Sequence, residues 1–311
     1  YIWLATEKEM TRLKMYLYEQ TETAVEITQL GWNRKGFYAF GNGVFDTEWH
    51  PVDEYGIVRL GDKGNYYLPA SSLIYRDDDK LFQFERRFVH LNYSSISLKE
   101  YFTKLVGVFG DNAKEGICFL LATLFRDIIT GYTKSFPILN LFGPKGSGKS
   151  ELGHSLMALF IIENIPPNIQ NATIPALADL VAQCANALVH IDEFKNNIDI
   201  DKREYLKGLW DGAGRSRMNM DRDKKREITA VDSGVILSGQ EMATADLALF
   251  SRLIFLTFAK SEFTEEEKRR YNELVEIRKR GLTHLTLQIL RHRARMEQQF
   301  ISNYHTCLSD V

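Results

Sequence analysis

The sequence is poor in cysteine, with only Cys118, Cys184 and Cys307 among its 311 residues. They are odd in number, far apart and set among apolar or helix-forming residues. A disulfide framework needs paired cysteines and a structural metal site needs closely spaced ones, so the pattern argues against both. We expect free, reduced thiols and a cytoplasmic protein.

A strong net charge is absent as well, because the 39 basic and 41 acidic residues leave a formal net charge of only −2. This argues against a protein that coats nucleic acid through bulk charge, and any such contact must be local. Long hydrophobic runs are also missing. The longest, over residues 116–125, stops at Arg126 and Asp127, well short of a membrane-spanning helix, so no membrane contact is expected.

Apolar residues are nevertheless plentiful, at 44% of the chain, which is long enough for one large or two ordinary domains. From about residue 24 to residue 91, short alternating or aromatic runs are separated by Gly, Asn and Asp, and they predict a β-rich domain. The predicted strands lie at 24–30, 37–45, 56–60, 65–68 and 81–89, and the glycines of residues 61–65 predict a hairpin turn.

The rest of the chain predicts helices and then an α/β core. Helical spacing covers residues 97–131, with one helix expected over 114–129, and the charged tail 264–304 is also predicted helical, capped at Thr264. Between them, strands predicted at 138–142, 187–191, 234–237 and 253–258 alternate with helices near 150–162, 174–184 and 202–211, which indicates a parallel sheet between helical layers. We expect an accessory domain (1–95), a helical connector (96–135), the core (136–260) and a C-terminal helical segment (261–311).

One segment carries most of the functional information, and it lies between a predicted strand and a predicted helix. It fits the phosphate-binding loop pattern GxxxxGK[ST]. Glycines let backbone N–H groups turn toward phosphate oxygens, and a helix N-terminus adds its positive dipole end. Lys149 is expected to reach the β and γ phosphates and Ser150 to bind Mg²⁺, so ATP and Mg²⁺ are the expected cofactors. The candidate nucleotide ligands are Gly143, Pro144, Lys145, Gly146, Ser147, Gly148, Lys149 and Ser150.

An acidic pair follows the next predicted strand, as ATP hydrolysis requires. Asp192 is the candidate ligand for the metal, and Glu193 is the candidate base that polarises the attacking water. The alternative is an acidic turn that closes a buried strand. No acceptor site typical of a small-molecule kinase is visible, so the pair favours hydrolysis over phosphoryl transfer to a substrate.

Two further polar residues follow predicted strands. Gln240, with Ser238 behind it, ends the third strand, where an amide can sense the γ phosphate or orient water, unless it simply terminates the strand. Arg252 stands at the start of the fourth strand. In an oligomer such an arginine can reach the nucleotide bound by a neighbouring subunit, and an ordinary surface arginine is the alternative.

The order of these motifs resembles the superfamily 3 helicases of the AAA+ class. The resemblance covers residues 100–260 and includes the segment 205–212 and Met220-Asp221-Arg222, which are similar to the region before the DNA hairpin of the papillomavirus enzyme. It implies an AAA+ P-loop core and a ring, most often a hexamer, with ATP between subunits. Lys207 matches a position that is often basic in the family, whereas the family usually has Asn where Gln240 stands.

The resemblance also implies a DNA-binding hairpin. Its tip is expected at residues 223–226, with Arg222, Lys224, Lys225 and Arg226 as candidate DNA ligands. This is the densest basic cluster of the chain, although charge alone also fits a solvated turn. Single-stranded or forked DNA and further copies of the chain are the expected partners, and a primase region could lie upstream of Tyr1.

The sequence thus favours an ATP-driven DNA helicase or translocase of a phage, plasmid or other mobile element. A nucleotide-switched assembly or defence protein is the alternative from a different class. Such a switch needs no basic hairpin. A small-molecule kinase shares the phosphate loop, but Glu193 and the hairpin count against it.

Overall fold

A four-stranded parallel sheet forms the core of the computed structural model, which describes residues 4–212, 216–218, 226–228, 231–260 and 262–309. Most of its residues are buried and most are apolar, as expected of a parallel sheet with both faces covered, whereas Ile254 and Thr257 of its last strand are exposed. The strand order is β10 (Leu188–Phe194), β13 (Gly234–Gly239), β8 (Ile138–Phe142) and β14 (Leu253–Thr257).

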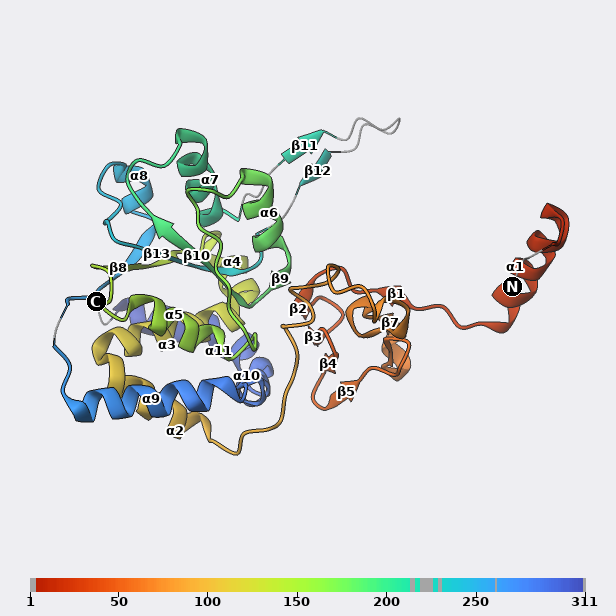
Figure 1. Cartoon of the computed structure of the whole chain (residues 1–311), viewed down its shortest axis with the longest axis horizontal. Coiled ribbons are helices and arrows are strands. Elements are labelled where there is room, and N and C mark those ends of the chain that lie inside the picture. Colours follow the sequence, from red (N-terminus) through yellow and green to blue (C-terminus); the bar gives the residue numbers. More distant parts are fainter. Residues whose placement is uncertain (1–3, 213–215, 219–225, 229–230, 261, 310–311) are drawn as a thin grey trace.

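Helices cover both faces of this sheet (Figure 1). On one side lie α3 (Asp111–Leu124) and α5 (Lys149–Met157), and on the other lie α6 (Ile174–Ala182), α7 (Ile200–Trp210) and the short α8 (Leu247–Phe250). The predicted α/β core is therefore confirmed, although α5 ends earlier than expected.

The N-terminal region is β-rich, as predicted, and packs around fully buried aromatic residues such as Phe37, Tyr38, Phe40 and Phe88. In one sheet, four successive strands pair antiparallel: β2 (Leu30–Asn33), β3 (Phe37–Phe40), β4 (Gly43–Phe45) and β5 (Trp49–Pro51). A second, mixed sheet contains β1 (Val25–Glu26), parallel to β7 (Asn65–Tyr67), and β6 (Ile57–Arg59), antiparallel to β7. The predicted turn joins β6 to β7 through the 3₁₀ turn η1 (Gly61–Lys63), with Gly61 and Gly64 at positive φ. Two more 3₁₀ turns follow, η2 (Pro69–Ser71) and η3 (Leu73–Tyr75).

A strand from the core region completes the first N-terminal sheet. β9 (Cys184–Ala185) pairs in parallel with β2, and the Gln29 side chain donates to the carbonyl of Ala182 at 2.9 Å. Cys184 is buried in this strand and is free, as are the exposed Cys118 and Cys307. We propose that the domain boundaries lie near residues 95, 135 and 260.

Two sequence predictions are wrong in detail. Residues 81–89 form turns rather than a strand, because Phe84 and Phe88 are four residues apart, are joined by a backbone hydrogen bond of 2.9 Å and both point inward. The helix predicted over 114–129 is two helices, α3 and α4 (Arg126–Thr133), bent by 83°. Asn186 holds the break, because its amide donates to the carbonyl of Leu124 at 3.0 Å and accepts from the N–H of Asp127.

The remaining helices flank the core. α2 (Leu98–Phe109) precedes α3, and the tail forms α9 (Glu265–Lys279), α10 (Thr283–Leu290) and α11 (Arg293–Ser309). The predicted cap is confirmed, since Thr264 and Glu267 form a capping box on α9. The N-terminal α1 (Glu7–Gln20), which the sequence analysis did not foresee, buries none of its residues and stands apart in Figure 1. In the described ranges no single helix is long and apolar enough to cross a membrane. Only the bent pair α3 and α4 has, taken together, the length and composition of a membrane-spanning segment.

Candidate active site

The loop of residues 143–150 connects the end of β8 to the start of α5, as the sequence predicts. Gly146 and Gly148 have φ of +80° and +89°, a left-handed conformation that glycine adopts without strain. Gly143 is needed for a different reason. A Cβ at this position would lie 2.3 Å from the carbonyl oxygen of Phe258, so only glycine lets the loop leave the sheet between β13 and β14.

Polar groups of this loop have few partners within the protein. The Ser147 hydroxyl is buried and has no hydrogen-bond partner in the described part of the chain. Lys149 is only 8% exposed, and among the described residues its Nζ reaches just the carbonyl of Pro144, at 3.5 Å. Ser150 is the second residue of α5 and is half-buried. The loop therefore presents a desolvated hydroxyl and a desolvated ammonium group beside a helix N-terminus.

The acidic pair lies at the end of β10, at the same edge of the sheet as the loop, because β10, β13 and β8 are parallel. The register of β10 shifts between Ile191 and Phe194, and Glu193 has φ of +60°, which is uncommon for a residue other than glycine. Such bulges re-aim side chains, and strained backbone of this kind occurs often at functional sites. The conformation is held by the Glu193 N–H, which donates to Asp192 Oδ1 at 2.8 Å.

The segment of residues 167–170, which no sequence motif marks, stabilises this bulge through hydrogen bonds. Asn168 forms a parallel bridge with Asp192, whose N–H donates to the carbonyl of Pro167 at 2.9 Å. The Gln170 amide donates to the carbonyl of Glu193 at 3.3 Å. No local motif marks this segment, because its partners lie more than twenty residues away.

Buried polar side chains stand directly behind Asp192. The Ser238 hydroxyl lies 2.5 Å from Asp192 Oδ1, and His190 Nε2 lies 2.7 Å from Ser238 Oγ. Burial lowers the pKa of His190 to about 4, against the opposing effect of Asp192. His190 is thus neutral at physiological pH. The sequence analysis placed Ser238 near the site but did not identify His190.

Gln240 and Arg252 lie at opposite ends of the parallel strands, Gln240 at a carboxyl end and Arg252 at an amino end. Gln240 follows β13, which lies between β8 and β10, and its exposed side chain is at the edge that carries the loop. Arg252 precedes β14, and its carbonyl accepts from the N–H of Ile138 at the start of β8. The loop begins six residues after Pro137, which at a rise of about 3.3 Å per residue is roughly 20 Å from the level of Arg252. Arg252 therefore does not reach the loop of its own chain.

The surroundings of Arg252 hold it in place. Its guanidinium donates to the carbonyl of Ala248 at 2.5 Å. Asp246 caps α8 by accepting from the N–H groups of Ala248 and Leu249, and it also pairs with Lys207 at 3.2 Å. The hydrogen bond to Glu204 raises the pKa of Lys207. Lys207 thus ties α7 to the short helix that positions Arg252.

Where the sequence predicts a hairpin, two short strands pair antiparallel, β11 (Ser216–Met218) and β12 (Arg226–Ile228). Arg226 was predicted to belong to the tip of the hairpin. Instead it pairs with Met218 and is the first residue of β12. Arg222, Lys224 and Lys225 lie outside the described residues. Their role stays a prediction.

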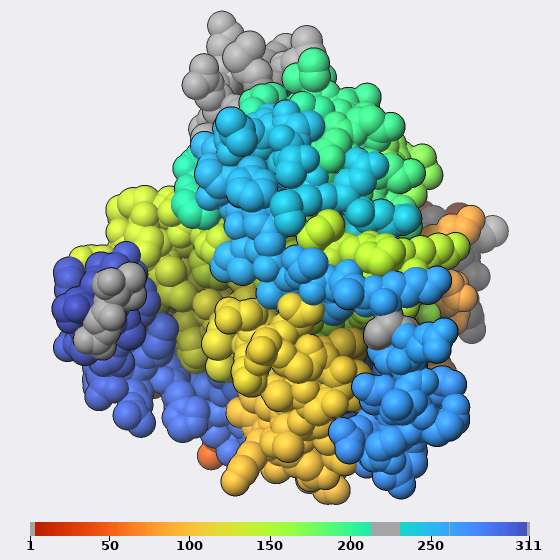
Figure 2. All heavy atoms as spheres, turned by 90° about the vertical axis from the view of Figure 1, so that its left-hand side faces the viewer, coloured from red at the N-terminus to blue at the C-terminus, as the bar shows by residue number. Residues whose placement is uncertain are grey.

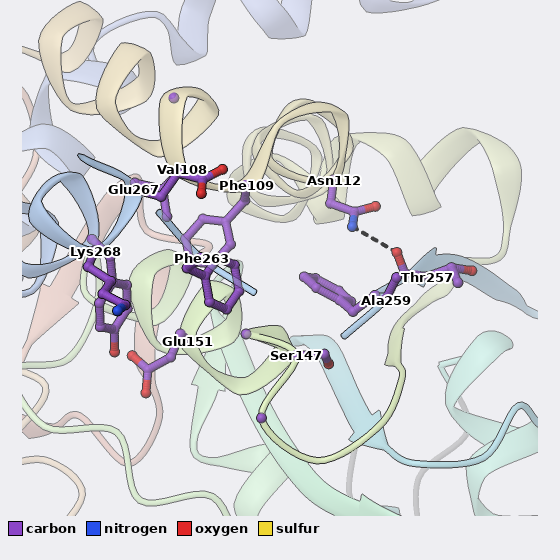
Figure 3. A pocket seen from close by; sticks show the side chains of 15 residues that line it. Val108, Phe109, Asn112, Ser147, Glu151, Thr257, Ala259, Phe263, Glu267 and Lys268 are labelled. Carbon is purple, nitrogen blue, oxygen red and sulfur yellow. Dashed lines mark hydrogen bonds between the residues drawn. The ribbon is translucent and has the colours of Figure 1, made fainter. Parts of the chain in front are cut away.

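A cavity of about 460 Å³ opens beside the phosphate loop, within the range of small-molecule sites (Figure 3). The end of α2, the end of β14 and the start of α9 enclose it, and the gold and blue segments of Figure 2 show these helices on one face. Phe109 lies against the loop, since a Cβ on Gly148 would be 3.6 Å from its ring. The Asn112 amide donates to the carbonyl of Thr257 at 2.9 Å. Aromatic and apolar lining residues include Val108, Phe109, Phe258, Phe263 and Tyr271.

This cavity could not be predicted from the sequence, because its walls come from parts of the chain about 150 residues apart. Each aromatic residue on its own is indistinguishable from a core residue. In the sequence, the helical spacing up to Phe109 and the cap at Thr264 are the signals for the end of α2 and the start of α9, which meet near the loop.

Comparisons with known proteins support the fold. No family model matches the chain, and no curated protein matches its sequence. The solved structure described as "SCCmec type IV Cch - active helicase" aligns over 96% of this chain with a TM-score of 0.52 and 12% identity. Two structures of JCV helicase align over 70% and 65% of this chain, covering 63% and 62% of their own chains, with TM-scores of 0.41 and 0.38 and 14% identity.

The fold is thus one that a solved helicase has. The chain spans about half the length of that structure, 52%. At this level of identity the likeness concerns the fold and not the residues of the site. The α/β core flanked by helices and preceded by a β-rich region is consistent with the AAA+ class predicted from the sequence.

Proposed function

We propose that this chain is an ATP-hydrolysing DNA helicase or translocase that works as a ring, with ATP bound between subunits. One observation carries the proposal. The phosphate loop on β8 and the acidic pair on β10 meet at one edge of the sheet, while Arg252 lies at the opposite edge. A chain with this layout holds most of a hydrolytic site and offers its arginine to another molecule.

The loop fits a bound nucleotide. Ser147 offers a buried hydroxyl without a partner in the described part of the chain, and Lys149 offers an ammonium group with only a distant acceptor. Phosphate oxygens would satisfy both. The adjoining cavity, lined by aromatic residues, has the size and chemistry for a nucleobase.

The metal would be Mg²⁺, held by Ser150 and Asp192. In the described ranges no cluster of three or more His, Cys, Asp or Glu side chains could hold a metal. Mg²⁺ does not need such a cluster, because it is usually bound through one or two protein ligands together with substrate phosphates and water. When bound, ATP supplies the phosphoanhydride bond, and Mg²⁺ neutralises the negative charge of the phosphates.

The chain's own residues would then divide the work. Lys149 binds the terminal phosphates, Asp192 orients the metal, and Glu193 accepts a proton from the attacking water. Gln240, which follows β13 at the same edge of the sheet, would contact the water or the γ phosphate. Arg252 of a neighbouring subunit stabilises the negative charge of the transition state.

DNA is the proposed partner because the paired strands β11 and β12 project from the core (Figure 1), and the basic residues Arg222, Lys224 and Lys225 lie between them in the sequence. Lysines at such a position bind the phosphate backbone without reading its sequence. The solved structure that shares this fold is described as an active helicase, which supports the helicase part of the proposal.

The test is steady-state ATP hydrolysis with and without single-stranded DNA. We expect DNA to stimulate the wild-type chain. Lys149→Ala should abolish hydrolysis under both conditions, and Lys224→Ala with Lys225→Ala should keep basal hydrolysis but lose the stimulation. Weakening of DNA binding with salt should also become less steep in the double variant, since two phosphate contacts are removed.

Two outcomes would contradict the proposal. Hydrolysis that DNA leaves unchanged would favour a nucleotide-switched assembly protein. Transfer of phosphate to an acceptor molecule instead of water would indicate a kinase.

The aromatic cavity makes a separate prediction. Phe109→Ala should weaken ATP binding about tenfold or more, because stacking of a base on an aromatic ring is worth about 1–3 kcal/mol. Fluorescence or calorimetric titration measures the change. Inorganic tripolyphosphate, which has no base, should bind the variant and the wild type equally.

The matched control is Tyr55→Ala, which removes an exposed aromatic residue of the N-terminal region. It should leave both affinities unchanged. Equal losses for ATP and tripolyphosphate in Phe109→Ala would show that the ring supports the loop and does not contact the base.

A further inference from the structure

A line of hydrogen-bonded side chains leads from Asp192 into the core. Ser238 Oγ lies 2.5 Å from Asp192 Oδ1, and His190 Nε2 lies 2.7 Å from Ser238 Oγ. On the far side of the ring, Asn164 Nδ2 lies 2.9 Å from His190 Nδ1 and 3.2 Å from His154 Nδ1. The line joins β10, β13, α5 and the segment after α5.

The positions of the protons follow from the acceptor at its end. A carboxylate can only accept, so Ser238 gives its single proton to Asp192. Ser238 must then accept from His190, which places the proton of the imidazole on Nε2. The other ring nitrogen is an acceptor and receives a hydrogen from the Asn164 amide. The groups that link Asn164, His190 and Ser238 therefore all donate toward Asp192, an arrangement in which the bonds polarise one another favourably. The other N–H of the Asn164 amide faces His154.

Packing fixes this arrangement. Ser238 is fully buried and His190 is 2% exposed. A Cβ on Gly153 would lie 2.8 Å from His190 Cε1, so α5, which begins in the phosphate loop, packs directly on the ring. The ring cannot turn away from Ser238 without displacing this helix.

One of the two carboxylate oxygens of Asp192 is therefore already hydrogen-bonded within the protein. Oδ1 accepts from Ser238 and from the N–H of Glu193, whereas Oδ2 accepts no hydrogen bond from the described residues. A carboxylate held in this way presents Oδ2 in one orientation.

We propose that His190 is a positioning residue for Asp192, acting through Ser238 so that Oδ2 faces the metal of the nucleotide site. The inference rests on the proposed function, because it assigns Asp192 to the metal. Partners of this kind, one shell behind a metal ligand, typically contribute 10- to 100-fold to metal affinity or activity. A buried histidine that only fills the core would contribute to stability and not to metal affinity.

The experiment compares His190→Leu, Ser238→Ala and the double variant with wild type. Binding of Mn²⁺, a stand-in for Mg²⁺ visible by electron paramagnetic resonance, is titrated in the presence of a non-hydrolysable ATP analogue. Each single variant should weaken Mn²⁺ binding about tenfold. The double variant should be no worse than the singles, because both substitutions break one line at the same place.

The control is Ser233→Ala, just before the same strand. Ser233 is also buried, but its hydroxyl donates to the carbonyl of Val181 at 2.9 Å, away from the site. Its Mn²⁺ affinity should stay within twofold of wild type. Nitrogen NMR of the wild type should show His190 protonated on Nε2.

Wild-type Mn²⁺ affinity in His190→Leu and Ser238→Ala would overturn the proposal, as would a proton on Nδ1. A double variant whose loss is the product of the single losses would overturn it too. The metal titration needs no turnover, so it decides the role of His190 even if the wild-type chain fails to hydrolyse ATP, a result that would count against the proposed function alone.

Discussion

Replacing Glu193 with Gln should lower ATP turnover by 10²- to 10⁴-fold while nucleotide affinity stays within about twofold of wild type. The amide has almost the same shape as the carboxylate but cannot accept the proton of the attacking water. The positive φ of Glu193 and its N–H bond to Asp192 concern the backbone, so the side chain keeps its direction in the variant. Single-turnover hydrolysis and equilibrium ATP binding measure the two quantities separately.

The matched control is Glu163→Gln, which makes the same exchange at an exposed position outside the site. It should leave turnover unchanged. Undiminished turnover in Glu193→Gln would exclude Glu193 as the base and leave Gln240 or another group to orient the water. A parallel loss of nucleotide affinity would show that the substitution disturbs the bulge instead of the chemistry.

The sequence predicts this site well wherever function and structure are both local. The strand of residues 138–142 and the loop after it were placed correctly, because an apolar run, a glycine-rich turn and a helix start are adjacent in the chain. The strand predicted at 234–237 is also confirmed, as β13, which lies between β8 and β10. The roles of the residues at these strand ends are still predictions.

Features that depend on distant partners could not be predicted in this way. The bend between α3 and α4 depends on Asn186, about sixty residues further along the chain. Nothing near Phe125 signals it, since the apolar periodicity continues across the break. His190 reads as one polar residue within a buried strand, and only the register of β10 against β13 brings it to Ser238.

The other large effect concerns Arg252. Arg252→Ala should lower ATP turnover about 10³-fold or more, as removal of an arginine finger does, with little change in ATP binding to the isolated chain. The reason is geometric. Arg252 lies at the edge of the sheet opposite its own phosphate loop, roughly 20 Å away along β8, so it can act only on a nucleotide held by another copy.

Mixing two inactive variants tests this directly. In a mixture of Arg252→Ala and Glu193→Gln chains, some interfaces pair an intact Glu193 with an intact Arg252 from the neighbour. With random assembly in equal amounts this holds for roughly a quarter of the interfaces of a cyclic ring, so turnover should rise well above that of either variant alone. Arg295→Ala is the control, because this exposed arginine bonds only Gln299 among the described residues, and it should behave as wild type.

Recovery in the mixture is expected only if the site is shared between chains. A catalytic role for Arg252 within its own chain predicts no recovery, because each chain would lack one of two residues that must act together. Wild-type turnover of Arg252→Ala at every protein concentration would remove the arginine from the mechanism. It would also remove the main structural argument for a ring, since Lys149, Asp192 and Glu193 lie at one edge of a single chain and do not by themselves require a second copy.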